Sequence, residues 1–111
     1  MEVEFDSPRL RKICSSEGAL RKEWGAPMAR KVMHRLADLE AAACLEDFRV
    51  LPGRCHELTG DRRRQLALDL VGPRRLIFRP ANIPLPVNQT GGLDWKKVTA
   101  VCIIEVVDYH D

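Results

Sequence analysis

The sequence predicts an α+β fold in which an N-terminal strand and a helical hairpin pack on a curved, mostly antiparallel sheet. The prediction rests on a short alternating segment at the N-terminus, an apolar stripe at helical spacing between residues 29 and 43, and several strand-like segments after residue 54. A chain of 111 residues that is 45% hydrophobic and 31% charged is typical of a globular protein. We therefore expect a single domain over residues 1–111.

The N-terminal segment combines a strand signal with a helix start. Val3 and Phe5 alternate with acidic residues, as in a half-buried strand. Ser7-Pro8 is typical of a helix N-terminus, because serine accepts a hydrogen bond from an unpaired backbone N–H and proline is pre-organised at the first helical position. A second helical segment is expected near residues 19–24.

The longest predicted helix follows the break at Gly25-Ala26-Pro27. Its apolar residues recur at spacings of three and four, which places them on one face: Ala29, Val32, Leu36, Leu39 and Ala43. The charged residues between them, His34 and Arg35 included, are expected to lie away from the core. Two helices joined at Gly25 would form an antiparallel hairpin.

The second half of the chain predicts the sheet. Strands are expected at 54–58, 66–70, 76–78 and 98–107, with turns at 59–61 and 72–73. The last of these segments is almost entirely apolar, which predicts an interior strand. The segment 80–95 is rich in proline and glycine and long for a sheet connection, so it is expected to be a mobile loop or to take part in binding.

The cysteines, the N-terminus and the apolar runs give the expected compartment. The four cysteines form no C-x-x-C pair, and the acidic N-terminus is unlike a signal peptide. We expect reduced thiols in a cytoplasmic protein, with Cys44 and Cys102 as buried apolar residues. Only Cys55 and His56 lie close enough to suggest a metal site, and adjacent residues rarely share one metal. No metal and no cofactor are therefore predicted. No membrane span is predicted either, because no apolar run approaches about 20 residues.

Positive charge is concentrated in residues 49–79, which hold eight arginines and only three acidic residues, a local charge of +5. Because the whole chain carries +2, the remaining residues sum to −3. Arginine suits bidentate contacts to phosphate, so this segment favours nucleic-acid binding over a merely solvated charged face. Six arginines are the candidate RNA-binding residues: Arg54, Arg62, Arg63, Arg64, Arg74 and Arg79.

Two histidines suggest phosphodiester chemistry. His56 lies beside the arginine-rich turn, and His110 ends the last strand next to Asp108 and Tyr109. A histidine can remove the proton of an RNA 2′-hydroxyl, a second group can protonate the leaving 5′-oxygen, and arginine can stabilise the phosphorane, with no metal required. The competing interpretation is that polar residues near a C-terminus are simply solvated.

Three motifs resemble the HigB-like branch of the RelE/ParE toxin superfamily: residues 56–62 (HELTGDR), the strand ending Arg75-Leu76-Ile77-Phe78, and the terminal Val107-Asp108-Tyr109-His110. The resemblance implies a RelE-like microbial ribonuclease fold. It also implies the toxin of a type II toxin–antitoxin pair, an mRNA endonuclease that acts on the ribosome. The implied partners are the ribosome with its mRNA and a HigA-like helix-turn-helix antitoxin, with operator DNA bound only through the toxin–antitoxin complex.

The resemblance also implies catalytic residues. His56 matches the family histidine before the Leu-x-Gly turn, and Arg75 matches the arginine that contacts the scissile phosphate. Asp108, Tyr109 and His110 match the terminal group associated with proton transfer and substrate orientation. The acid and base roles of His56 and His110 stay open, and Tyr109 is expected either to stack on a base or to hydrogen-bond the phosphate.

Three departures from the family pattern leave alternatives open. Thr59 replaces a frequent lysine, Leu66 replaces a frequent tryptophan, and the loop 80–97 is longer than the family hairpin. Arg62, Arg63 or Arg64 can replace the missing cation electrostatically. The alternatives are a ParE-like gyrase inhibitor without nuclease activity, a catalytically degenerate member that only binds RNA or its antitoxin, and an unrelated small RNA-binding domain.

Overall fold

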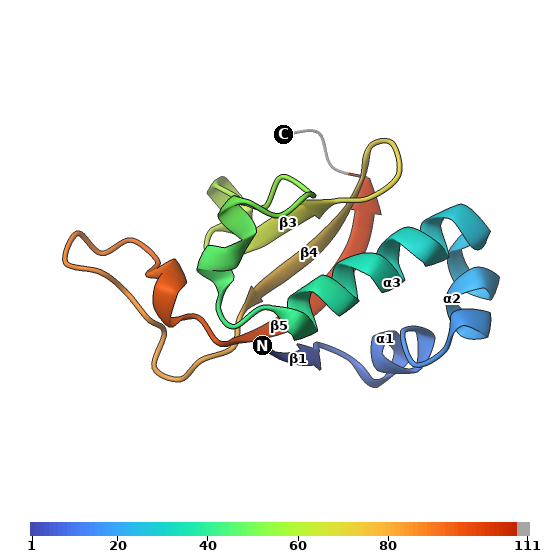
Figure 1. The fold of residues 1–111 in the computed structure, drawn as a ribbon, viewed down its shortest axis with the longest axis horizontal. Coiled ribbons are helices and arrows are strands. Elements are labelled where there is room, and N and C mark those ends of the chain that lie inside the picture. Colours follow the sequence, from blue (N-terminus) through green and yellow to red (C-terminus); the bar gives the residue numbers. More distant parts are fainter. Residues whose placement is uncertain (109–111) are drawn as a thin grey trace.

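A mixed sheet carries a layer of α-helices on one face (Figure 1). The computed structural model describes residues 1–108, and its five strands lie in the order β1-β5-β4-β3-β2. Their bounds are β1 Glu2–Phe5, β2 His56–Glu57, β3 Leu66–Asp69, β4 Arg74–Pro80 and β5 Ala100–Asp108. Only β1 and β5 pair in parallel, so the predicted α+β class and the mostly antiparallel sheet are confirmed.

The helical layer consists of α1 Pro8–Ile13, α2 Glu17–Trp24 and α3 Ala26–Ala41. The predicted start of α1 is confirmed, because the Ser7 hydroxyl accepts a hydrogen bond of 3.1 Å from the backbone N–H of Leu10. The predicted hairpin is also present: Gly25, at a φ of 82°, ends α2 and leads directly into α3. Helix α3 ends before Ala43, which is exposed instead of joining the apolar stripe.

Helix α3 buries its predicted apolar face and, in addition, one arginine. Ala29, Val32 and Leu39 are fully buried, and His34 is exposed as predicted. The prediction that Arg35 lies away from the core is wrong, because this residue is only 7% exposed. Its side chain is long enough to cross the edge of the core, and its Nε donates a 2.9 Å hydrogen bond to the carbonyl oxygen of Asp69 at the end of β3.

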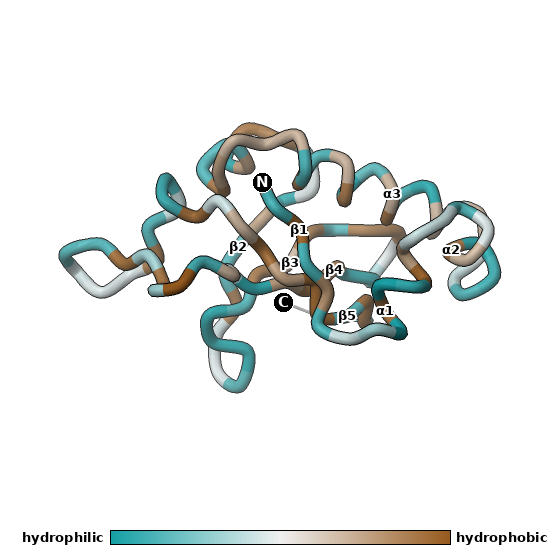
Figure 2. The backbone as a smooth tube through the Cα atoms, turned by 90° about the horizontal axis from the view of Figure 1, so that it is seen from below, coloured by the Kyte–Doolittle hydropathy of each residue, from teal (hydrophilic) through white to brown (hydrophobic). Residues whose placement is uncertain are grey.

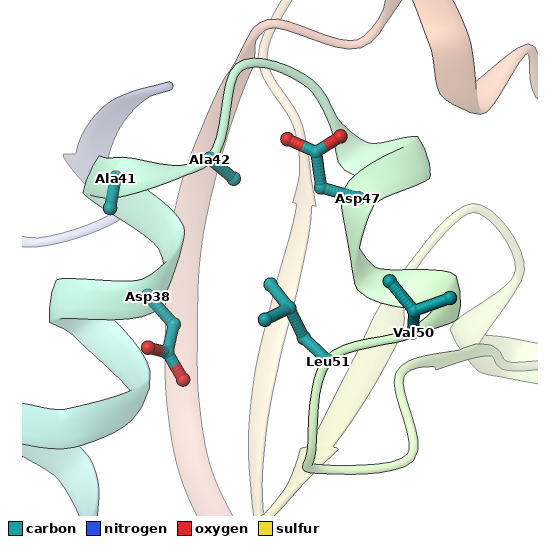
Figure 3. Close-up of a pocket in the computed structure, with 6 residues that line it drawn as sticks. All are labelled: Asp38, Ala41, Ala42, Asp47, Val50 and Leu51. Carbon is teal, nitrogen blue, oxygen red and sulfur yellow. The ribbon is translucent and has the colours of Figure 1, made fainter.

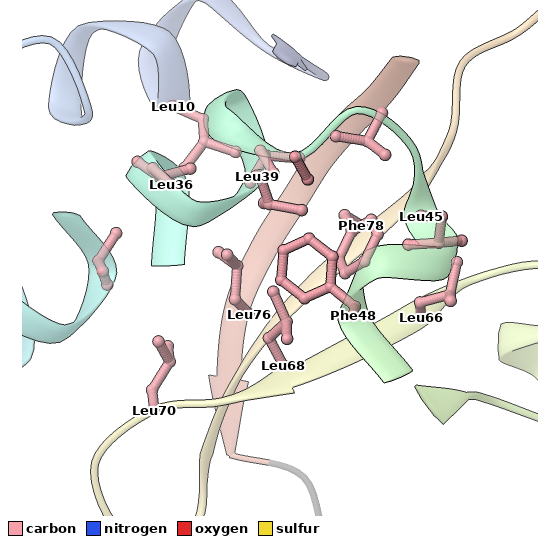
Figure 4. Close-up of a cluster of buried hydrophobic side chains, with 14 of the residues drawn as sticks. Leu10, Leu36, Leu39, Leu45, Phe48, Leu66, Leu68, Leu70, Leu76 and Phe78 are labelled. Atoms are coloured by element: carbon pink, nitrogen blue, oxygen red, sulfur yellow. The ribbon is translucent and has the colours of Figure 1, made fainter. Parts of the chain in front are cut away.

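The main core lies between the helices and the sheet. Leucines of α1 and α3 meet side chains of β3 and β4 there, Leu76 and Phe78 among them (Figure 4). A smaller cluster lies on the opposite face of the sheet, where Leu58, Ala67 and Ile77 are buried. The strand β3 is therefore buried on both faces, with Ala67 on the side away from the helices.

The connecting segments hold short 3-10 turns at Leu45–Arg49, Gly60–Arg62 and Trp95–Lys97. Strand β2 is shorter than the predicted 54–58. The predicted loop after β4 projects from one end of the molecule (Figure 1), and Trp95 anchors its return. The Trp95 Nε1 donates a 2.9 Å hydrogen bond to Glu57, and the Arg49 guanidinium lies 4.1 Å from the centre of the indole ring.

Hydropathy follows this layering. Hydrophobic positions concentrate along the strands, whereas hydrophilic and hydrophobic positions alternate along α3, as expected for a helix with one face on the core (Figure 2). Across residues 1–108, no helix combines the length and the apolar character needed to cross a membrane.

Candidate functional site

The sheet face that points away from the helices carries two of the predicted site residues, His56 and Arg75, together with Asp69. His56 pairs with Ala67, which pairs with Ile77, and Asp69 pairs with Arg75. Residues paired across antiparallel strands project to the same side, and so do alternate residues of one strand. Since Leu66, Leu68 and Leu76 point into the helical core, His56, Asp69 and Arg75 project from the opposite face.

Asp69 holds two guanidinium groups on this face. Arg54 donates to both carboxylate oxygens, at 3.1 Å from Nε and 3.1 Å from Nη2. The Nε of Arg75 lies 2.9 Å from Asp69 Oδ1. We call Arg54, His56, Asp69 and Arg75 the Asp69 cluster. Two cations share one carboxylate, so Arg54, Asp69 and Arg75 together keep a formal charge of +1.

The backbone of Asp69 is fixed from the helical side. Its N–H donates a 2.8 Å hydrogen bond to the Gly53 carbonyl, and its own carbonyl accepts from Arg35. Gly53 has a φ of +114°, and a Cβ there would lie 3.0 Å from a methyl carbon of Leu68 and 3.1 Å from the Arg35 guanidinium carbon. Glycine is required because the guanidinium lies against the bare Cα. The buried arginine thus links α3 to the cluster.

The imidazole of His56 is oriented by the backbone just before it. Its Nδ1 lies 2.7 Å from the carbonyl oxygen of Arg54. A carbonyl only accepts hydrogen bonds, so Nδ1 carries the hydrogen. His56 and Arg75 are separated by two interstrand spacings and by two residues along the strands, about 12 Å between their Cα atoms. A phosphodiester and its neighbouring ribose can span that distance.

Two further predicted arginines lie near the cluster and are paired with acids of β5. Arg62 donates a 3.0 Å hydrogen bond to Glu105, across the small apolar cluster. The Nε of Arg74 lies 3.0 Å from Asp108 at the end of β5. Arg62 is therefore paired with a carboxylate in the fold.

The remaining predicted arginines lie elsewhere. Arg79 alternates with Arg75 on β4, but it lies near the other end of the strand, 3.8 Å from Asp6. Arg64 donates to the Gly91 carbonyl of the projecting loop, at 3.1 Å. Arg63 is exposed on the turn before β3.

The positive charge of residues 49–79 is largely balanced in space. Within residues 1–108, six of its eight arginines form ion pairs: Arg49, Arg54, Arg62, Arg74, Arg75 and Arg79. Four of the acidic partners come from outside the segment: Asp6, Glu46, Glu105 and Asp108. Charge that is segregated along the sequence is thus not segregated in the fold.

The terminal group is described only in part. Asp108 is the last described residue, and Tyr109 and His110 lie outside the described residues. The sequence places both directly after β5, whose Val107 pairs with Arg75 of the Asp69 cluster.

Sequence reasoning missed Asp69, Glu105 and Arg35. A signal for Asp69 was present: it is a polar residue in the predicted strand 66–70, just before the Gly72-Pro73 turn, and a tight hairpin there places it opposite Arg75. No comparable signal identifies Arg35, because its partner is a backbone carbonyl 34 residues away.

A hollow of about 340 Å³ lies away from this face, between the end of α3 and the 3-10 turn Leu45–Arg49 (Figure 3). It holds two carboxylates among apolar side chains, and one of them, Asp47, already accepts a 2.9 Å hydrogen bond from the Ala43 N–H. It contains none of the predicted site residues.

The described residues contain no group of three or more His, Cys, Asp or Glu side chains that could hold a metal ion. Comparisons of the chain with protein-family models, with curated proteins and with solved structures found no match. The class defined by the structure is therefore an α+β protein with a helical layer on one side of its sheet and an arginine–carboxylate–histidine face on the other.

Proposed function

We propose that this protein is an endoribonuclease toxin of a type II toxin–antitoxin pair that cuts mRNA on the ribosome. The observation that carries the proposal is the arrangement of Arg54 and Arg75 around one carboxylate, on the same sheet face as His56. The sequence resemblance to HigB-like toxins supports the choice of RNA as substrate.

The Asp69 cluster has the charge that a phosphodiester requires. Arg54 and Arg75 together carry two positive charges against the single charge of Asp69, so a phosphate can take the place of the carboxylate at one guanidinium. The Arg54 side chain is 53% exposed and can move toward a ligand, whereas the Arg75 side chain is only 13% exposed and is held in place. Arg75 is the group we assign to the scissile phosphate.

The proposed reaction needs one base and one acid. The base removes the proton of the 2′-hydroxyl, and the O2′–P bond forms while the P–O5′ bond breaks. The acid then protonates the leaving 5′-oxygen, which gives a 2′,3′-cyclic phosphate and a 5′-hydroxyl. His56 and His110 are the candidates for the two roles, Arg75 stabilises the phosphorane, and Asp108 and Tyr109 orient the substrate.

The proposal includes partners and a compartment. A helix-turn-helix antitoxin neutralises the toxin, and the pair binds operator DNA. The ribosome presents the mRNA, and the protein acts in the cytoplasm without a cofactor.

The test is inducible expression of the wild-type protein and of three variants in a bacterium, followed by mapping of the mRNA 5′ ends in those cells. We expect growth arrest with codon-phased cuts, which are lost in His110→Ala and Arg75→Ala. The matched control is Arg79→Ala, on the same strand and face but at the other end, and it should cut normally. Growth arrest with DNA damage and intact mRNA would instead identify a gyrase inhibitor. Growth arrest with mRNA cuts that show no codon phasing would also reject the proposal, and so would arrest with unchanged mRNA.

A catalytically degenerate protein that only binds RNA or its antitoxin is the second candidate. The observation that favours it is the Arg62–Glu105 pair, because Arg62 is then not available to supply the cation that Thr59 lacks. Absence of growth arrest, together with RNA binding by the purified protein, would select this candidate.

A further inference from the structure

We propose a second RNA-binding surface on the outward side of α3, which docks the phosphate backbone of a double-stranded RNA segment. Its residues are Pro27, Arg30, Lys31 and His34, which we call the α3 basic patch. The choice of RNA over DNA rests on the proposed function. The surface itself is inferred from its positive charge, from the cations there that have no acidic partner in the described chain, and from its shape.

The helices of this protein carry more basic than acidic residues. Residues 8–41, which span α1 to α3, hold eight lysines and arginines and four acidic residues, a net charge of +4. In residues 49–79, by contrast, acids brought in by the fold pair with most of the arginines.

Most of the cations in this layer have no acidic partner. Arg9 pairs with Glu23 at 3.2 Å, and the buried Arg35 lies 4.0 Å from Asp38. The other six make no ion pair with any residue of the described chain 1–108: Arg11, Lys12, Arg21, Lys22, Arg30 and Lys31. Their charge is available to a polyanion.

The α3 basic patch borders an open hollow as well as carrying charge. Its residues line about 370 Å³ on the side of α3 opposite to the buried Ala29 and Val32. Arg30 and His34 are one turn apart, so their side chains gather within about 6 Å along the helix axis.

The patch and the Asp69 cluster lie on opposite sides of the molecule. The patch is on the outer side of the helical layer, whereas the cluster projects from the sheet face that points away from the helices. One short RNA strand cannot bind both at once. The patch therefore docks the protein on a large RNA, while a separate strand reaches the sheet face.

The chemistry of the patch favours the backbone of a duplex over unpaired bases. Among the described residues, no Phe, Tyr or Trp side chain lines it, and base stacking on such rings is the main source of affinity for single strands. Cations that contact phosphates bind without reading sequence, and their affinity falls steeply with salt.

The test measures binding of a labelled 20-base-pair RNA duplex by fluorescence anisotropy from 50 to 200 mM salt. At 100 mM salt the double variant Arg30→Gln/Lys31→Gln should bind at least about tenfold more weakly, with a salt slope reduced by about two. The matched control Lys96→Gln/Lys97→Gln removes the same charge from an exposed turn and should lose less than about threefold.

Three outcomes would overturn the inference: equal loss in both double variants, no binding by the wild-type protein, or equally tight binding of a DNA duplex of the same sequence. Circular dichroism of each variant checks that it is folded. Arg75→Gln separates this inference from the proposed function, because it should abolish cleavage and leave duplex binding within about twofold. If duplex binding fails while cleavage depends on Arg75, only the docking surface is rejected.

Discussion

The Nε of Arg75 lies 2.9 Å from the Asp69 carboxylate, directly across the β3–β4 hairpin. The same carboxylate accepts both hydrogen bonds of the Arg54 fork. Asp69 thus has two opposing effects. It stabilises the fold by pairing with two cations, and it competes with any phosphate for the same two guanidinium groups.

Asp69→Asn should therefore change stability and RNA affinity in opposite directions. Loss of the charge weakens both ion pairs, and because Arg54 is half exposed we expect a cost of only about 1–2 kcal/mol in the free energy of unfolding. The face gains one net positive charge, so single-stranded RNA should bind more tightly and with a steeper salt dependence.

Urea denaturation and RNA titration test the two effects of Asp69→Asn separately. The control is Asp61→Asn, an equal charge change at an exposed residue of the turn before β3. Tighter RNA binding in both variants by the same factor would show that only the overall charge matters, and not the competition at the Asp69 cluster.

Arg35 is the second target, because it joins the helical layer to this site. Arg35→Ala removes a nearly buried side chain and leaves the Asp69 carbonyl without its donor. We expect a loss of about 2–4 kcal/mol in the free energy of unfolding. His34→Ala, its exposed neighbour on α3, should stay within about 0.5 kcal/mol of the wild-type protein. Equal stability of the two variants would contradict the structural role of Arg35.

The sequence predicts most of the fold because the local signals agree with one another. Ser7 caps α1, Gly25 separates α2 from α3, and the turn at Gly72-Pro73 closes the β3–β4 hairpin, as expected. The error at Arg35 has a physical cause. This residue is buried through a contact with a distant segment, and periodicity within one element cannot detect such a contact.

The site is less predictable than the fold. The register of β3 and β4 follows from the hairpin, so Arg75 and Asp69 could have been paired in advance. The pairs that neutralise Arg62, Arg74 and Arg79 could not, since their acidic partners lie 34 to 73 residues away in the sequence. Charge counted along a segment therefore overestimates the charge that a folded surface presents.

Gly53 gives a sharp test of the packing beneath the Asp69 cluster. Gly53→Ala adds a methyl group 3.0 Å from Leu68 and 3.1 Å from the Arg35 guanidinium, at a backbone φ of +114° that disfavours alanine. We expect a destabilisation of about 2–3 kcal/mol. Gly18→Ala, in open space in the first turn of α2, should instead stabilise the protein by about 0.5 kcal/mol. Thermal denaturation of both variants measures the contrast, and a shift of the same sign in both would contradict it.

Burial of Cys55 predicts a loss of stability at alkaline pH. Desolvation raises the pKa of this thiol to about 12 from its ordinary 9, outweighing the smaller opposing effect of Arg49. Between these two values the unfolded chain releases a proton that the folded protein retains, so the free energy of unfolding is unaffected below about pH 9 and falls above it. At pH 10 the loss from this group is about 1 kcal/mol.

Urea denaturation at pH 8 and pH 10 measures this loss, with Cys55→Ala as the control. The variant is expected to start from a lower stability, because a partly buried side chain is truncated, and then to lose less on going to pH 10. The Cys55 thiol should also react with iodoacetamide far more slowly at pH 8 in the folded protein than in urea, since only the thiolate reacts. An equal pH dependence in both proteins would show that the Cys55 thiol is solvated in the folded protein. Equal alkylation rates in the folded and the unfolded chain would show the same.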